Sequence, residues 1–123
     1  MRILRILAGF VGALTTFPCF AYPMHGVGVT SCAEFARLYQ VAPENTELVF
    51  FSWGQGYMSG LNISAMGQGF MARDLAGDQG QQKQEIRRYC ANNPLKNYMD
   101  AVFDLYAKRP PYVDDTAKPN DQK

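Results

Sequence analysis

ELVFFSWGQGYMSGLNIS, residues 47–64, is the stretch that decides the fold of this 123-residue chain. Large apolar side chains recur along it at the helical spacing of three and four: Phe50, Trp53, Tyr57 and Leu61. A helix with so little polar surface is normally buried among other helices, so the stretch predicts the central helix of a small bundle. The alternative is a buried strand pair around residues 49–53, because valine and phenylalanine favour strands, but no hairpin partner lies nearby.

A second stripe on this helix consists of small side chains, each four residues from the last: Ser52, Gly56, Gly60 and Ser64. A glycine inside a helix costs about 1 kcal/mol relative to alanine, and close approach of a neighbouring helix offsets that cost. We therefore expect this stripe to pack against another helix, within the bundle or in a homodimer. Because the run is shorter than the roughly 20 apolar residues that cross a bilayer, we expect no stable membrane insertion.

The first 21 residues have the pattern of a signal peptide. Arg2 and Arg5 precede an apolar segment, residues 6–17, and Ala21 offers a small residue before a cleavage site. An amino-terminal anchor helix is the alternative, but the apolar segment is short and Pro18 ends it. The pattern predicts an exported protein whose mature part is long enough for one small domain.

Removal of the signal peptide lowers the number of cysteines from three to two, Cys32 and Cys90. In an exported chain, such a pair most simply forms one disulfide. In the loop-entropy model, a disulfide that closes a loop of this length stabilises the fold by about 4 kcal/mol. A catalytic thiol or a metal site is the competing interpretation, which the absence of a CxxC motif and the single histidine disfavour.

Charge and titratable residues narrow the function classes. The whole chain has 12 basic and 11 acidic side chains, a balance that offers no electrostatic case for binding nucleic acid. The one histidine, His25, has no catalytic partner nearby, and Asp100 and Asp104 are spaced like solvated charges on a helix face. The sequence therefore predicts no enzyme, no metal site and no cofactor.

Capping and proline signals place the first boundaries. Residues 22–30 are rich in proline and glycine and predict a flexible arm. A capping box, Ser31 to Glu34, begins a helix that ends before Pro43. Residues 65–80 contain several glycines and predict a surface loop, with a turn or two of helix at residues 70–75 as the alternative.

The second half of the chain predicts two more helices. Asp78 caps a helix that runs to about Asn92, and Asn93-Pro94 has the pattern of an N-cap followed by a first helical residue. The apolar stripe of this last helix is Leu95, Tyr98, Met99, Val102, Leu105 and Tyr106. Two prolines end it, and residues 110–123 predict a disordered tail. We thus expect an all-α, single-domain bundle of about four helices over residues 31–109, with one disulfide. The sequon Asn62-Ile63-Ser64 lies on the central helix, and we interpret it as incidental.

With these elements placed, the chain resembles the periplasmic acid-stress chaperones of the HdeA/HdeB family. The similarity begins at Cys32-Ala33-Glu34-Phe35 and is strongest at residues 86–97, IRRYCANNPLKN. Residues 51–57, FSWGQGY, stand where the family has its long central helix. The resemblance covers about residues 31–108; the glycine stripe, the glycine-rich middle loop and the charged, proline-containing tail depart from it.

This resemblance implies a periplasmic helical protein with a disulfide between Cys32 and Cys90. It also implies a holdase for acid resistance and stress response, which exposes apolar surface at low pH and binds acid-denatured periplasmic proteins. Phe50, Trp53, Tyr57 and Leu61 would then serve as core or as client-binding residues.

A second resemblance points to another class of function. Trp53, Gly56, Tyr57 and Gly60 match a motif of the Rap/Tai immunity proteins of type VI secretion. Those are exported helical proteins that bind and inhibit one cognate toxin. The cysteine placement of that family is matched less well, so the immunity function is the alternative to the chaperone.

Overall fold

The computed structural model describes residues 24–114, and the expected signal peptide and most of the expected tail lie outside this range. A 3-10 turn, η1 (Val27–Val29), precedes α1 (Cys32–Val41), α2 (Pro43–Gly67), α3 (Gln79–Asn92) and α4 (Tyr98–Lys108). The described part of the chain contains helices and no named strand, which confirms the all-α bundle.

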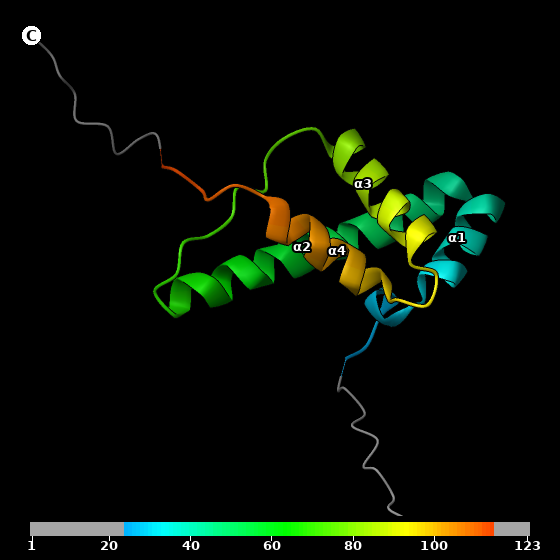
Figure 1. Cartoon of the computed structure of the whole chain (residues 1–123), viewed down its shortest axis with the longest axis horizontal. Helices are drawn as coiled ribbons and strands as arrows, with labels where there is room; N and C mark the ends of the chain where they lie inside the picture. Colours follow the sequence, from blue (N-terminus) through cyan, green and yellow to red (C-terminus); the bar gives the residue numbers. More distant parts are fainter. Residues whose placement is uncertain (1–23, 115–123) are drawn as a thin grey trace, which may run out of the picture.

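Helix α2 is the axis of the molecule. Its 25 residues span about 37 Å, and in Figure 1 it runs the length of the structure with α1 beside its N-terminal part. Pro43 occupies its first turn, where a missing N–H costs nothing, and the Thr46 hydroxyl donates to Leu38 O (3.1 Å). The central helix is therefore confirmed, and the strand alternative is wrong.

The core forms where α1, α2 and α4 each contribute one aromatic ring. The ring centroids of Phe35, Phe50 and Tyr98 lie 4.8 to 5.0 Å apart in all three pairings. Such pairs contribute roughly 0.5–1.5 kcal/mol each beyond their buried area. Helix α3 completes the core with Ile86, and Val102 of α4 is fully buried.

Two of the expected helix starts are confirmed by their caps. Ser31 Oγ accepts from the Glu34 N–H (3.2 Å), and Asp78 Oδ1 accepts from the Gly80 N–H (2.7 Å). The Glu34 carboxylate pairs with the Arg37 guanidinium through two bonds of 2.7 and 2.8 Å. This contact lowers the pKa of Glu34.

The expected start of the last helix at Asn93-Pro94 is wrong. Helix α4 begins at Tyr98, and a capping box joins Asn97 and Asp100. Residues 94–97 bond to the start of α1 instead: Cys32 N–H donates to Lys96 O (2.7 Å) and Ala33 N–H to Pro94 O (3.0 Å). Leu95, expected on the apolar stripe, is 95% exposed because this connection faces solvent.

Both ends of the helical domain extend beyond the expected limits. Gly28 is buried and η1 packs on α2 and α4, so the expected arm is part of the fold at residues 27–30. At the other end, Tyr112 N–H donates to Ala72 O and Asp74 N–H to Pro110 O, both at 2.8 Å. Residues 70–76 form the expected loop, without the alternative helical turn.

Candidate functional site

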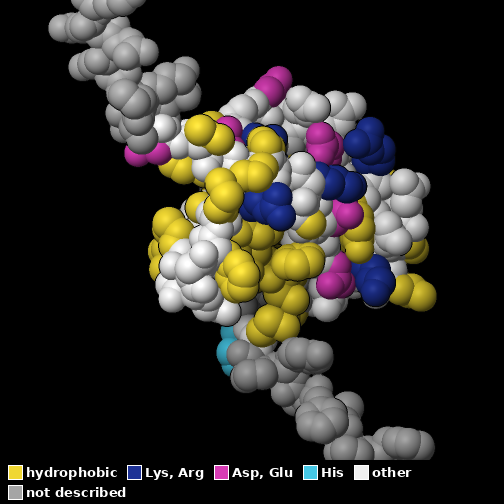
Figure 2. All heavy atoms as spheres, turned by 60° about the vertical axis from the view of Figure 1, so that its left-hand side comes forward, with side chains coloured by type: hydrophobic (Ala, Val, Ile, Leu, Met, Phe, Trp, Pro, Cys, Tyr) yellow, Lys and Arg dark blue, Asp and Glu magenta, His cyan; other side chains and the backbone are white. Residues whose placement is uncertain are grey.

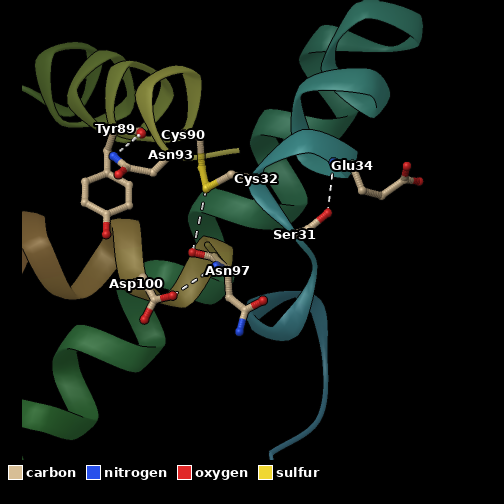
Figure 3. Close-up of a disulfide and its surroundings, with 8 residues drawn as sticks. All are labelled: Ser31, Cys32, Glu34, Tyr89, Cys90, Asn93, Asn97 and Asp100. Carbon is tan, nitrogen blue, oxygen red and sulfur yellow. Dashed lines mark hydrogen bonds between the residues drawn. A yellow bond between two sulfur atoms is a disulfide. The ribbon is translucent and has the colours of Figure 1, made fainter. Parts of the chain in front are cut away.

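The disulfide joins Cys32 and Cys90, as predicted, and ties the start of α1 to the end of α3 (Figure 3). The two Cα atoms are 4.7 Å apart, and both side chains are buried. Cys32 Sγ lies 3.7 Å from Asn97 O, which is a contact because a disulfide sulfur has no proton to donate. Asn93 Nδ2 donates to Tyr89 O (2.9 Å). The end of α3 is therefore held by the disulfide at Cys90 and by this side-chain bond.

The predicted aromatic stripe of α2 divides into a core part and a surface part. Phe50 is buried, whereas Trp53, Tyr57 and Leu61 are half-buried. The Trp53 and Tyr57 rings stack with a centroid distance of 5.2 Å and an angle of 8°. Burial raises the pKa of Tyr57, and the nearby Asp100 carboxylate adds to the increase. The half-buried residues therefore form an aromatic surface beside the core.

Trp53 also contacts the segment before α1, residues 24–29, which we name the N-terminal strap. A Cβ on Gly28 would overlap the six-membered ring of Trp53, and a Cβ on Gly26 would lie 3.3 Å from Trp53 Nε1. Gly26 also has φ +91°, a conformation that favours glycine. The two glycines thus let the strap backbone lie directly on the indole ring.

The small-residue stripe makes no contact with another helix of the described range, residues 24–114, so the prediction of packing within this bundle is wrong. Ser52, Gly56, Gly60 and Ser64 are all exposed, and a Cβ on either glycine would meet nothing within 4 Å. The packing glycine is Gly54, on which a Cβ would lie 3.1 Å from Val102 Cγ2. The small residues do recur on one side of the helix, as predicted. However, the side of α2 that packs against α4 is the one that carries Gly54.

From Leu48 onward, the side of α2 that faces solvent carries no charge, and we name this part of the helix surface the outer face. It consists of Leu48, Val49, Ser52, Gly56, Ser59, Gly60, Ile63 and Met66, all of them exposed. The sequence has no Asp, Glu, Lys or Arg between Glu47 and Arg73. A stretch of exposed apolar surface without charge is typical of an interaction site.

The outer face continues into a distal patch at the C-terminal end of α2. Its members are large apolar side chains that are more than half exposed: Ile63, Met66, Phe70, Met71, Tyr112 and Val113. A shallow hollow of about 350 Å³ lies among Met66, Leu75 and Tyr112. Figure 2 shows hydrophobic side chains gathered on this side of the molecule, with most of the visible charged side chains toward one margin.

Asn62 attaches the loop that carries this patch, a role that the sequence analysis missed. Its Nδ2 donates to Arg73 O and its Oδ1 accepts from the Arg73 N–H, both at 2.8 Å. The Tyr106 hydroxyl donates to the same Oδ1 (3.0 Å). The sequon is therefore incidental to this fold, because the Asn62 side-chain amide already bonds to Arg73 and Tyr106. The signal available in the sequence was a polar residue within an otherwise apolar helix.

A cluster of charges joins α2 to α3, and the sequence analysis missed it as well. The Glu47 carboxylate pairs with the Arg87 guanidinium and lies 3.9 Å from Lys83 Nζ. The Arg87 guanidinium also lies over the Tyr39 ring (5.3 Å), and Lys83 Nζ lies over the Phe51 ring (5.2 Å). One carboxylate thus compensates two cations that rest on aromatic rings.

Two further carboxylates, both on α4, have structural partners. Asp100 caps α4, and Asp104 pairs with Lys108 (2.5 Å). Within residues 24–114, no group of three or more His, Cys, Asp or Glu side chains is arranged to hold a metal ion. No helix in this range is both long enough and apolar enough to span a membrane.

Comparisons with models of protein families, with curated proteins and with solved structures found no match to this chain.

Proposed function

We propose that this protein is a periplasmic holdase that binds acid-denatured proteins through apolar surface. The observation that carries the proposal is the uncharged outer face of α2, which continues into the distal patch. Two of the six patch members are methionines, whose flexible side chains suit surfaces that bind many partners. The resemblance of the cysteine segments to the HdeA/HdeB family supports the same function.

The distribution of charge supports activation by acid. Near pH 2 the carboxylates are protonated, and the net charge of the chain without Arg2 and Arg5 rises to roughly +11. Protonation of Glu47 leaves Arg87 and Lys83 uncompensated against α2. Glu34, whose folded pKa is lowered, stabilises the fold above its unfolded pKa and ceases to do so as the pH falls through the folded one.

The disulfide limits the consequence of this destabilisation. Cys32 and Cys90 connect α1 to α3 whatever the protonation state, and loss of packing in acid leaves the chain compact. Apolar surface around Trp53 and Tyr57 then joins the surface that is already exposed. Such a state holds unfolding clients without a catalytic group.

A homodimer at neutral pH fits the same surface. A two-fold axis places the same face on both sides of the interface, so a face with a net charge repels its copy and an uncharged face does not. The outer face of α2, with Gly56 and Gly60 at its centre, allows close approach of a second α2. We propose this face as the dimer contact, which dissociation in acid frees for clients.

The test is light scattering from an acid-denatured client with and without this protein. We expect suppression of aggregation at pH 2–3 and none at pH 7. The matched control is a variant with Ile63→Asp and Met66→Lys, which puts charges on the distal patch while the buried core is untouched. Equal suppression by the parent and this variant would remove the patch from the client surface.

The same assay separates the holdase from the alternative, an immunity protein. No suppression at any pH, together with tight binding to one toxin at pH 7, would contradict the holdase and support the immunity function.

A further inference from the structure

The N-terminal strap lies against Trp53, one ring of the aromatic surface on α2. Trp53 contacts the strap backbone at Gly26 and Gly28, and its ring stacks with Tyr57. Val27 packs against the core residues, whereas Val29 is 44% exposed. A short segment without charge, Gly26–Val29, thus lies on an aromatic pair of a helix that itself has no charge there.

Within residues 24–114, hydrogen bonds to another element are found only at the C-terminal end of the strap. Thr30 O accepts from the Tyr98 N–H (2.8 Å), and Ser31 forms a β-bridge with Asn97. Among the described residues, the hydrogen bonds of residues 24–29 stay within the turn itself: Val29 N–H to Gly26 O and Thr30 N–H to Val27 O. Apolar packing and the ring contact therefore hold the strap, and it can swing about Thr30 without breaking a hydrogen bond to α2 or α4.

We propose that the strap occupies the client site and resembles a client. On this proposal, which rests on the holdase function, the surface of Trp53 and Tyr57 takes short uncharged segments. Their glycine or other small residues lie on the indole ring as Gly26 and Gly28 do, and a neighbouring β-branched side chain packs against the core as Val27 does. When packing loosens in acid, as proposed above, the strap leaves this surface and a client segment replaces it. The carboxylate that acts on this surface is Asp100, beside Tyr57.

Acid also increases the number of client segments that are uncharged and can bind to the surface of Trp53 and Tyr57. Near pH 2, the Asp and Glu side chains of a client are neutral, so segments that are charged at pH 7 lose their negative charge. A site that lies on an uncharged helix accepts them without a desolvated ion. Segments rich in Lys or Arg keep their charge and remain poor ligands.

Trp53 is the only tryptophan of the chain, so its fluorescence reports on this contact directly. We expect its emission to shift to longer wavelength, and its quenching by acrylamide to rise, at the same pH at which suppression of client aggregation begins. Added client should shield Trp53 again. Full suppression in acid while Trp53 stays shielded from acrylamide in the absence of client would overturn the strap proposal.

A variant tests the same point at pH 7. Gly28→Val places a branched side chain where the Trp53 ring lies, so we expect it to displace the strap, expose Trp53 and give suppression at neutral pH. Gly67→Val is the matched control, because nothing lies within 4 Å of a Cβ there and Gly67 belongs to neither the outer face nor the distal patch. Exposed Trp53 without neutral-pH suppression in Gly28→Val would overturn the strap proposal.

A second pair of variants guards against misfolding of Gly28→Val. Val27→Asp puts a charge against the core and should release the strap, whereas Val29→Asp puts the same charge on an exposed position of the same turn. Equal Trp53 quenching in the two variants would overturn the proposal. Absence of suppression by the parent at every pH would instead overturn the holdase function, and the client site with it.

Discussion

At the scale of single residues, α2 contains two kinds of glycine with opposite consequences. Gly54 faces Val102 and Tyr98, where even a methyl group would be crowded, while Gly56 and Gly60 face open space. Glycine thus allows close helix packing at position 54, whereas at positions 56 and 60 it only lowers the helix propensity of the chain.

We predict that Gly54→Leu lowers the free energy of unfolding by about 1–3 kcal/mol or more, because a large side chain overpacks the α2–α4 contact. Gly56→Leu should leave the stability unchanged or raise it by about 0.5–1 kcal/mol, because it replaces glycine in a solvent-facing helix. Thermal melts of dilute, monomeric protein measure both. A larger loss in Gly56→Leu than in Gly54→Leu would reverse the assignment of the two faces.

Tyr98 gives the fold a dependence on alkaline pH. Burial raises its pKa, and Arg87 opposes the increase only in part. A raised folded pKa means that the stabilisation is complete below the unfolded pKa, about 10, and is lost as the pH rises through the folded value. We predict that Tyr98→Phe flattens the decline of stability above pH 10 in urea titrations, whereas Tyr112→Phe, at an exposed position, does not. Parallel declines in parent and Tyr98→Phe would contradict this role.

Residue-level features were predictable from the sequence where the signal is local. Ser31 and Asp78 were recognised as caps because the cap bonds join residues only two to three positions apart. The packing role of Gly54 was not recognised, because two glycine-containing faces of one helix have similar spacing and only the partner helix decides between them. The contact between Gly28 and Trp53 joins distant positions, which no local pattern reports.

At the scale of elements, side-chain bonds add to the backbone bonds with residues 110–112 in holding the loop between α2 and α3. Asn62 bonds both backbone groups of Arg73, as a neighbouring strand would, and the Arg109 side chain donates from Nε to Asp74 O (2.8 Å) and also to Ala76 O. The distal patch depends on this attachment, because Phe70 and Met71 belong to the loop.

We predict that Asn62→Leu releases the loop and lowers the free energy of unfolding by about 1–3 kcal/mol, since it leaves the Arg73 N–H and C=O without this partner. Asn62→Asp should show a smaller effect, because a carboxylate still accepts from the Arg73 N–H. Hydrogen exchange of residues 70–76 measures the release directly. Unchanged exchange in Asn62→Leu would show that Arg109 and the backbone bonds to residues 110–112 hold the loop without Asn62.

The contact between α2 and α3 provides an acid-sensitive element. Glu47→Gln removes the charge that compensates Arg87 and Lys83, so we predict a loss of about 1 kcal/mol at pH 7. At pH 2 the parent carboxyl is itself protonated, and the difference between parent and variant should vanish. Urea titrations at the two pH values measure this, with Glu44→Gln at an exposed position as the control. A difference that persists at pH 2 would mean that Glu47 acts through packing.

The order and approximate ends of the elements were predictable, but the start of α4 was not. Asn93-Pro94 has a stronger local start signal than Asn97-Tyr98, and a sequence pattern cannot register the two bonds from residues 94–97 to the start of α1. Those bonds hold residues 94–96 in a turn, so the helix starts four residues later than predicted. The bonds lie beside the disulfide between Cys32 and Cys90, which the sequence did predict.

At the scale of the whole molecule, a small disulfide-linked bundle leaves much of its longest helix without a partner. The core lies around Phe35, Phe50 and Tyr98 at one end of α2, and the distal patch lies at the other. This uneven distribution is the basis of the proposed function: a tied core that withstands acid, and an uncharged apolar surface that is available to unfolded chains.

Direct binding of a client is the measurement that tests this account most directly. A dye-labelled, acid-denatured client is mixed with the disulfide-bonded protein at pH 2.5 and at pH 7, and the mixtures are followed by sedimentation velocity. The account predicts a soluble complex at pH 2.5 and a client that sediments independently of the protein at pH 7. A client that sediments alone at both pH values would contradict it.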